Sequence, residues 1–221
     1  MAKTTRSTIN CPGCGREVTV EMIDSADGVA DPQVKEAILE GDFAMYKCPE
    51  CGEGIDLLYQ FAYHDGSKKL LLWMLPPSED GDEDVEASED FIKTSFLMED
   101  CAMRKVRDKN ELREKVLLAE SGRDDRIVEV MKPGVYSVLT EKVGGKQIIA
   151  ILYEKNSDGE YFVIQLDTGE VGTIDFPEEM YDGIKERYGD QIEEATGDAA
   201  IQSINNEWAA EFVQNYMVKK N

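Results

Sequence analysis

The apolar residues of the first 75 positions alternate with polar ones, which predicts a module built mainly of β-strands. Between Glu17 and Ile23 every second side chain is apolar, as expected of a strand with one buried face. On the same basis, strands are expected over residues 17–23, 43–47, 55–63 and 69–75. One helix is expected between the first two, because Asp31-Pro32 is typical of a helix start and Gly41 of a helix end.

Farther along the chain the apolar spacing becomes helical and then alternates again. Helices are expected to begin near Asp108 or Asn110 and at Asp124-Asp125, and the second to end at Pro133-Gly134. Three antiparallel strands are expected over residues 147–153, 160–167 and 172–176. A helix over residues 178–188 should follow, and then a longer one after Asp198 with an apolar stripe formed by Ile201, Ile204, Trp208, Phe212 and Tyr216.

These patterns predict an α+β fold in four parts. The parts are an N-terminal β module with an inserted helix (residues 8–75), an acidic linker or loop (76–90), a helical segment (91–132) and a small α+β portion (133–221). Residues 91–98, at the start of the helical segment, are compatible with a helix or a strand. The linker contains two prolines and carries a charge of −8. An acidic recognition tail is the functional alternative for it.

Four of the five cysteines occur in two similar turns, Cys11-Pro12-Gly13-Cys14-Gly15 and Cys48-Pro49-Glu50-Cys51-Gly52. A two-residue spacer between cysteines places both thiolates on one metal ion, and zinc prefers four such ligands in a tetrahedron. The sequence therefore predicts one structural zinc ion held by Cys11, Cys14, Cys48 and Cys51, with no coordination position left for a substrate. Two disulfides, Cys11–Cys14 and Cys48–Cys51, are the alternative.

The composition is strongly acidic, with 46 Asp and Glu against 24 Lys and Arg, for a net charge of −22. Such a chain is expected to repel nucleic acids and anionic membranes. The longest apolar run, residues 70–75, is too short to cross a bilayer. The polar start of the chain does not resemble a signal peptide. Together with cysteines in metal-type spacing, this predicts reduced thiols and a cytoplasmic location.

The order of these motifs resembles that of the CpXC family, zinc-ribbon-like proteins of bacteria and archaea. The matching elements are the two cysteine turns, the Tyr63-His64-Asp65 turn and the stretches 110–116 and 124–129. The likeness covers residues 11–132. It implies a zinc-ribbon-like module but supplies no activity that could be transferred to this chain.

Several residues outside the cysteine turns are candidates for chemistry. His64, the only histidine, is either a base beside Asp65 or a half-buried hydrogen-bond partner. Cys101 is either a reactive thiol near basic residues or a small buried side chain. Asp124-Asp125 either forms a carboxylate site with Glu129 or begins a helix. A basic cluster either docks a phosphate or acidic peptide or offsets nearby acids; it comprises Arg104, Lys105, Arg107, Lys109 and Arg113.

The sequence lacks the phosphate-binding, nucleophile-elbow and two-histidine zinc motifs of common enzymes. No catalytic residue is predicted, and the leading hypothesis is a zinc-stabilised interaction or scaffold module for another protein. Two alternatives are a nucleic-acid-associated zinc ribbon and a redox sensor that releases zinc on oxidation. The oligomeric state does not follow from the sequence.

Overall fold

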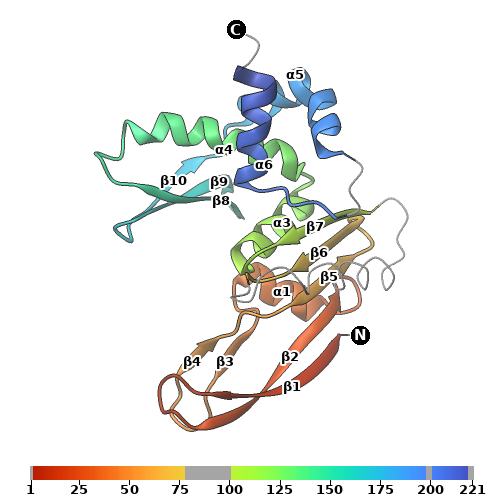
Figure 1. The fold of residues 1–221 in the computed structure, drawn as a ribbon, viewed down its shortest axis with the longest axis vertical. Coiled ribbons are helices and arrows are strands. Elements are labelled where there is room, and N and C mark those ends of the chain that lie inside the picture. Colours follow the sequence, from red (N-terminus) through yellow and green to blue (C-terminus); the bar gives the residue numbers. More distant parts are fainter. Residues whose placement is uncertain (1, 78–100, 198–200, 219–221) are drawn as a thin grey trace. The chain divides into compact units, whose positions relative to one another are not determined.

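The computed structural model describes residues 2–77, 101–197 and 201–218. Predictions for Asp198, for residues 91–98 and for most of the 76–90 segment lie outside these ranges. The chain divides into two compact units, Met1–Arg113 and Glu114–Asn221, with the division inside helix α3 (Lys109–Ser121). Each unit contains strands and helices, which confirms the α+β class (Figure 1).

The first unit is organised around a five-stranded mixed sheet. Its order is β1 (Lys3–Asn10), β2 (Glu17–Asp27), β5 (Phe61–Asp65), β6 (Leu70–Met74) and β7 (Ala102–Val106). The β1–β2 and β5–β6 pairs are antiparallel, whereas β2–β5 and β6–β7 are parallel. All five side chains of β6 are buried, which is typical of a strand covered on both faces.

Two strands of this sheet differ from the sequence predictions. Strand β1 was not predicted. Most of its side chains are exposed, and its sequence is mainly polar, without the apolar alternation that predicts a strand. Strand β7 lies within residues 91–132, where a helical segment was expected. Its residues pair in parallel with β6 from Leu70↔Ala102 to Met74↔Val106. Parallel pairing with a distant buried strand is a tertiary effect that local patterning does not reveal.

The long strand predicted over residues 55–63 is wrong, because two short strands replace it. Strand β4 (Gly54–Asp56) pairs with β3 (Met45–Lys47), and β5 begins only at Phe61. Ile55 packs beside the cysteines, whereas the Phe61 ring lies 4.4 Å from that of Phe43. The alternating run thus supplies side chains to two different apolar contacts instead of to one face of a single strand.

Helix α1 (Pro32–Glu40) agrees with its predicted limits. Val34 and Ile38 form its buried face, and Gly41 ends it with a φ of 85°. Two basic side chains of α3 donate to carbonyls at or just after the end of α1: Arg113 Nε to Leu39 O in the last turn at 2.7 Å, and Lys109 Nζ to Phe43 O beyond the helix at 3.3 Å. Cations at a helix C-terminus satisfy its free carbonyls and complement its dipole.

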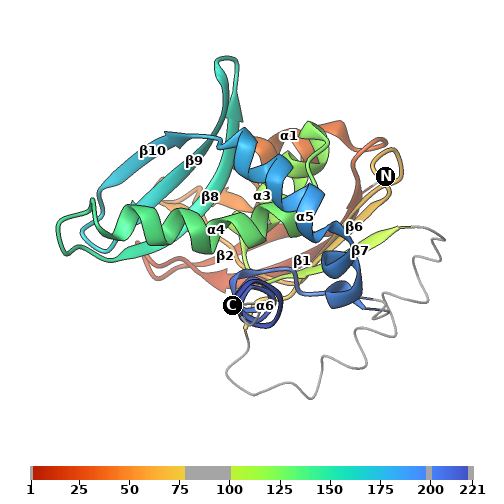
Figure 2. The same cartoon turned by 90° about the horizontal axis from the view of Figure 1, so that it is seen from above.

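The second unit contains an antiparallel sheet of β8 (Ile148–Asn156), β9 (Gly159–Leu166) and β10 (Val171–Asp175), with β9 central. All three strands were predicted. Helix α4 (Asp125–Thr140) runs along one face of this sheet (Figure 2). Phe162, Ile164 and Leu166 of β9 are buried, which identifies this as the inner face.

Three helical predictions for this unit need correction. Helix α4 continues through Pro133 instead of ending there. Helix α5 (Glu178–Thr196) is longer than expected. The last helix begins only at Asn206, because the Asn205 side chain accepts from the Glu207 and Trp208 N–H groups. It comprises α6 (Asn206–Phe212) and the π-helical turn η1 (Val213–Val218), where the rings of Trp208, Phe212 and Tyr216 stack.

Among residues 2–77, 101–197 and 201–218, no helix combines the length and apolar character needed to cross a bilayer.

Candidate metal centre

The two cysteine turns have the same backbone geometry at the ends of two hairpins. The first connects β1 to β2, and the second connects β3 to β4. Cys11 N donates to Arg16 O and Cys48 N to Glu53 O, at 2.9 and 2.8 Å. Gly15 N and Gly52 N donate back to the first cysteine of each turn. Both glycines have positive φ, 70° and 79°, which explains why the sequence has glycine at both positions.

The four sulfur atoms lie within 4.8 Å of one another, although 33 residues separate Cys14 from Cys48. Cys11 Sγ is 3.6 Å from Cys51 Sγ, and Cys14 Sγ is 3.9 Å from Cys48 Sγ. A tetrahedral ion bound to sulfur at about 2.3 Å requires sulfur–sulfur distances of about 3.8 Å. The cluster therefore has dimensions that fit a metal ion. All five cysteines are free thiols, so the alternative of two disulfides finds no support.

The cysteines of each turn differ in their surroundings. Cys11 and Cys48 are buried, and a small apolar cluster surrounds them, formed with Val18, Val20 and Ile55. Cys14 and Cys51 are exposed. An ion pair between Arg16 and Glu50 joins the two turns at the surface. Partly buried apolar side chains pack against this cluster; they are Ile9, Met22, Tyr46 and Leu57.

The pKa values of the Cys11 and Cys51 thiols shift in opposite directions. The Cys14 N–H is the main group that lowers the pKa of Cys11, to about 7. The Glu53 N–H favours the Cys51 thiolate, but burial and the other three sulfurs outweigh it and raise the pKa of Cys51 to about 12. Close sulfurs oppose simultaneous ionisation, and a bound cation removes that opposition.

Comparison with known protein families supports the same region. Residues 9–132, more than half of the chain, match the family described as CpXC protein. The chain belongs to the CpXC family. This confirms the resemblance predicted over residues 11–132, and the CpXC match includes both cysteine turns. Comparisons with curated proteins and with solved structures find no match.

His64 is a half-buried hydrogen-bond partner in this CpXC chain. Its Nδ1 lies 3.0 Å from Asp27 Oδ2, and Asp27 Oδ1 accepts from the Val29 and Ala30 N–H groups. These N–H groups, with His64, lower the pKa of Asp27. The pair connects the turn before α1 to the end of β5. His64 is not part of the cysteine cluster.

A buried carboxylate next to His64 has a larger structural role than the sequence suggested. Asp65 Oδ1 accepts from Ser67 and from Lys68 N, and Asp65 Oδ2 lies 2.7 Å from Lys35 Nζ. Burial opposes its ionisation, but the Lys35 ammonium and the hydrogen bonds lower the pKa of Asp65. The sequence predicted a turn at Tyr63-His64-Asp65, but these three residues are the end of strand β5 and the turn follows them. The burial of Asp65 was not predicted.

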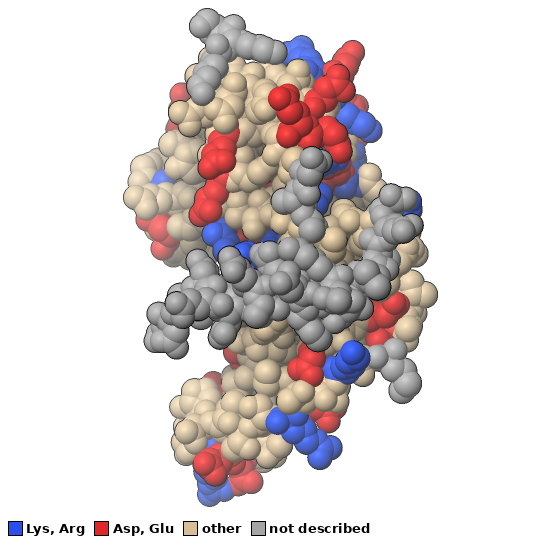
Figure 3. All heavy atoms as spheres, turned by 45° about the vertical axis from the view of Figure 1, so that its right-hand side comes forward, with Lys and Arg blue, Asp and Glu red and all other residues tan. Residues whose placement is uncertain are grey.

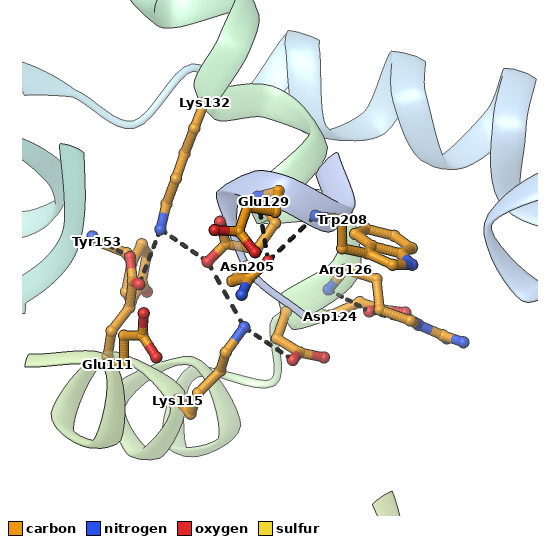
Figure 4. A network of polar contacts seen from close by, with 12 residues as sticks. Glu111, Lys115, Asp124, Arg126, Glu129, Lys132, Tyr153, Asn205 and Trp208 are labelled. Carbon is orange, nitrogen blue, oxygen red and sulfur yellow. Dashed lines mark hydrogen bonds and ion pairs between the residues drawn. The ribbon is translucent and has the colours of Figure 1, made fainter. Parts of the chain in front are cut away.

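Asp124, Asp125 and Glu129 do not form a carboxylate site, because all three are paired with basic side chains. Figure 4 shows Asp124 beside Arg126, and Glu129 between Lys115 and Lys132. Asp124 accepts from Arg126 N, as a helix cap, and from the Arg126 guanidinium. Asp125 Oδ2 lies 3.0 Å from Lys115 Nζ, and Glu129 Oε1 lies 3.5 Å from the same nitrogen. The prediction that Asp124-Asp125 begins a helix is confirmed.

These residues belong to a larger set that we call the buried ion chain: Asp125, Lys115, Glu129, Lys132 and Glu114. Lys132 Nζ donates to Glu129 and Glu114, both at 2.8 Å, and Glu114 also accepts from Tyr153 N at 2.6 Å. Burial raises the pKa of Glu114. Burial alone would lower the pKa of Lys132, but the two glutamates raise it. The buried ion chain connects α3, α4 and β8 inside the second unit.

The predicted basic cluster is largely engaged within the first unit. Arg107 forms an ion pair with Glu111, and Lys109 with Asp56. Arg113 binds a carbonyl of α1, and Arg104 is buried. Burial raises the pKa of Cys101 despite the opposing effect of Arg104, which disfavours a reactive thiolate.

Proposed function

We propose that Cys11, Cys14, Cys48 and Cys51 hold one structural zinc ion, and that the protein is a zinc-stabilised interaction or scaffold module without catalytic activity. The observation that supports this most directly is the approach of four sulfurs to within 4.8 Å of one another. When bound, zinc would join the two hairpins through four thiolates. Metal binding of this kind contributes roughly 10–16 kcal/mol to the folding of small zinc modules.

The proposal that the protein has no catalytic role is supported by the ion pairs that the candidate acids and bases form. His64 is held by Asp27, Asp124 by Arg126, and Glu129 by Lys132. A four-thiolate site also leaves no position for water or substrate. These side chains stabilise turns and helices in the part of the chain that the structure describes.

The alternative of nucleic-acid binding loses support from the ion pairs of the basic residues. Such binding needs clustered free Lys and Arg side chains. On the face drawn in Figure 3, the described basic side chains are interspersed with acidic ones and form no continuous basic surface. With a net charge of −22, a protein partner is the better proposal.

The metal site is tested by serine substitutions with a matched control. Purified, reduced wild-type protein should contain one zinc per chain. Cys11→Ser and Cys48→Ser should lose most of the bound zinc, whereas Cys101→Ser, the same change at the fifth cysteine, should retain it. Cobalt substitution should give the absorption bands of a tetrahedral thiolate site.

The structural role is tested by amide hydrogen exchange before and after chelation. Residues 9–22 and 45–57 should lose protection on zinc removal, and residues 148–166 should keep it. A reduced protein with substoichiometric zinc that stays fully protected in chelator would refute the proposal. So would a turnover that Cys11→Ser abolishes without loss of protection.

A further inference from the structure

The sheet of the second unit has an outer face opposite the one that α4 covers. Its side chains form three rows across β8, β9 and β10, which are Ala150–Gln165–Val171, Leu152–Val163–Thr173 and Glu154–Tyr161–Asp175. Every side chain in these rows is half-buried or exposed. Val171, at the edge, is 64% exposed. We call these nine residues the outer sheet face.

The composition of the outer sheet face changes from one end to the other. The first two rows are mainly apolar, whereas the third contains two carboxylates and a tyrosine. A hollow of about 320 Å³ lies at this acidic end, lined by residues that include Asp158, Tyr161, Thr173 and Asp175. The apolar rows therefore lead directly to a cavity large enough for a long side chain.

The hollow has the chemistry of a cation site. Glu160 at its wall is already paired with Arg123 and Lys155. Among the residues that the structure describes, Asp158 and Asp175 have no ionic partner. The Tyr161 ring beside them is a surface on which a guanidinium can stack. Two carboxylates and an aromatic ring suit arginine better than lysine, because its planar group can bind and stack at once.

The charge of the unit restricts the class of partner. The second unit, residues 114–221, carries a net charge of −11, which opposes nucleic acids and anionic membranes. Self-association through this face would also bring like charges together. A basic segment of another protein is attracted by the same field. The apolar rows would give such a segment a surface for hydrophobic contacts.

We propose that the outer sheet face binds a basic, partly apolar peptide segment of another protein, with an arginine in the hollow beside Asp158 and Asp175. Rows two residues apart are about 7 Å apart. An extended segment with an arginine followed by apolar residues at alternate positions matches this spacing. The surface lies in the unit without cysteines, so the inference is independent of the metal centre.

The test uses the full-length protein and a short synthetic peptide with one arginine followed by two alternate apolar residues. Nuclear magnetic resonance titration should shift the amides of Tyr161, Val163, Thr173 and Asp175. The double variant Asp158→Asn, Asp175→Asn should weaken binding at least tenfold. The control Glu179→Gln, Glu186→Gln removes the same charge from exposed positions of α5 and should leave the affinity unchanged.

Several outcomes would overturn the proposal. One is that no amide resonance shifts at millimolar peptide. Another is that both double variants weaken peptide binding equally. A third is that a peptide with glutamate in place of arginine binds equally well. The same shifts with a single-stranded oligonucleotide or with anionic vesicles would also reject a protein segment. Repeating the titration with Cys11→Ser separates the two proposals. Peptide binding that survives metal loss supports the outer sheet face whatever the cysteines bind.

Discussion

Gly28 illustrates how one small residue permits the close packing of a turn. It lies between β2 and α1, where Gly28 N donates to His64 O at 2.7 Å. A Cβ atom at this position would lie 2.2 Å from Tyr63 Oη and 2.7 Å from Asp65 Oδ2. Both neighbours are held in place, since Tyr63 and Asp65 are 1% exposed. A larger residue at position 28 must therefore displace buried polar groups.

We predict that Gly28→Ala lowers the free energy of unfolding of the first unit by about 1–3 kcal/mol through overpacking. Denaturant unfolding followed by the fluorescence of buried Trp73 measures this. Gly66→Ala is the matched control, because its nearest neighbour would be His64 Cε1 at 3.5 Å, an ordinary contact. Equal effects of the two substitutions would refute the packing argument.

Glu114 is the residue of the buried ion chain whose protonation we expect to make stability depend on pH. Its carboxylate is buried, and three carboxylates of the ion chain face two ammonium groups. The Tyr153 N–H on β8 also donates to this carboxylate, at 2.6 Å. Burial raises the pKa of Glu114, so the folded state binds a proton more tightly than the unfolded state.

Because the folded state binds this proton more tightly, the contribution of Glu114 to stability should increase as pH falls from neutral towards the ordinary glutamate pKa. The wild-type protein should gain stability relative to Glu114→Gln over that window, by at most about 1.4 kcal/mol per pH unit. Unfolding of the second unit, followed by Trp208 fluorescence, measures the difference. A difference that falls with acidification would show that the two lysines outweigh burial.

Among the elements, α4 differs most clearly from its sequence prediction. Proline lacks an N–H and usually ends or bends a helix. Here the helix continues for seven residues beyond Pro133, and Val135 is buried. Gly134 lies against α5, where an added Cβ would be 3.4 Å from Met180 Cε. Packing of the second half of α4 thus outweighs the missing hydrogen bond.

We predict that Pro133→Ala raises the free energy of unfolding of the second unit by roughly 1–3 kcal/mol, since it restores a donor for the Glu129 carbonyl. Denaturant unfolding and hydrogen exchange along residues 129–137 measure the effect. Pro177→Ala at the start of α5 is the control, because no intrahelical bond is missing there. Loss of stability in Pro133→Ala would show that ring packing dominates.

At the scale of the whole molecule, the two units differ in how they are stabilised. The first combines a fully buried strand, β6, with a cysteine cluster that is part of a small apolar cluster. The second has an aromatic core in which Tyr153, Phe162, Phe176 and Tyr181 pack closely, together with the buried ion chain. Metal removal should therefore affect the first unit and spare the second, as the exchange experiment tests.

The sequence alone determined features that depend on nearby residues. Two cysteines with a two-residue spacer, followed by a glycine of positive φ, specify a turn whose sulfurs can bind a metal ion. Helix α1 between Asp31 and Gly41, and the strands β8 to β10, likewise have local signals in spacing and turn residues. These features were predicted correctly because the residues that specify them are adjacent in the chain.

Only the tertiary structure decided features that depend on distant partners. The polar strand β1 exists because β2 pairs with it, and β7 because β6 does. Lys115 and Glu129 are charged side chains that are nevertheless buried, because each meets an opposite charge. Strand pairing and burial depend on segments far apart in the chain, so local sequence patterns do not predict them.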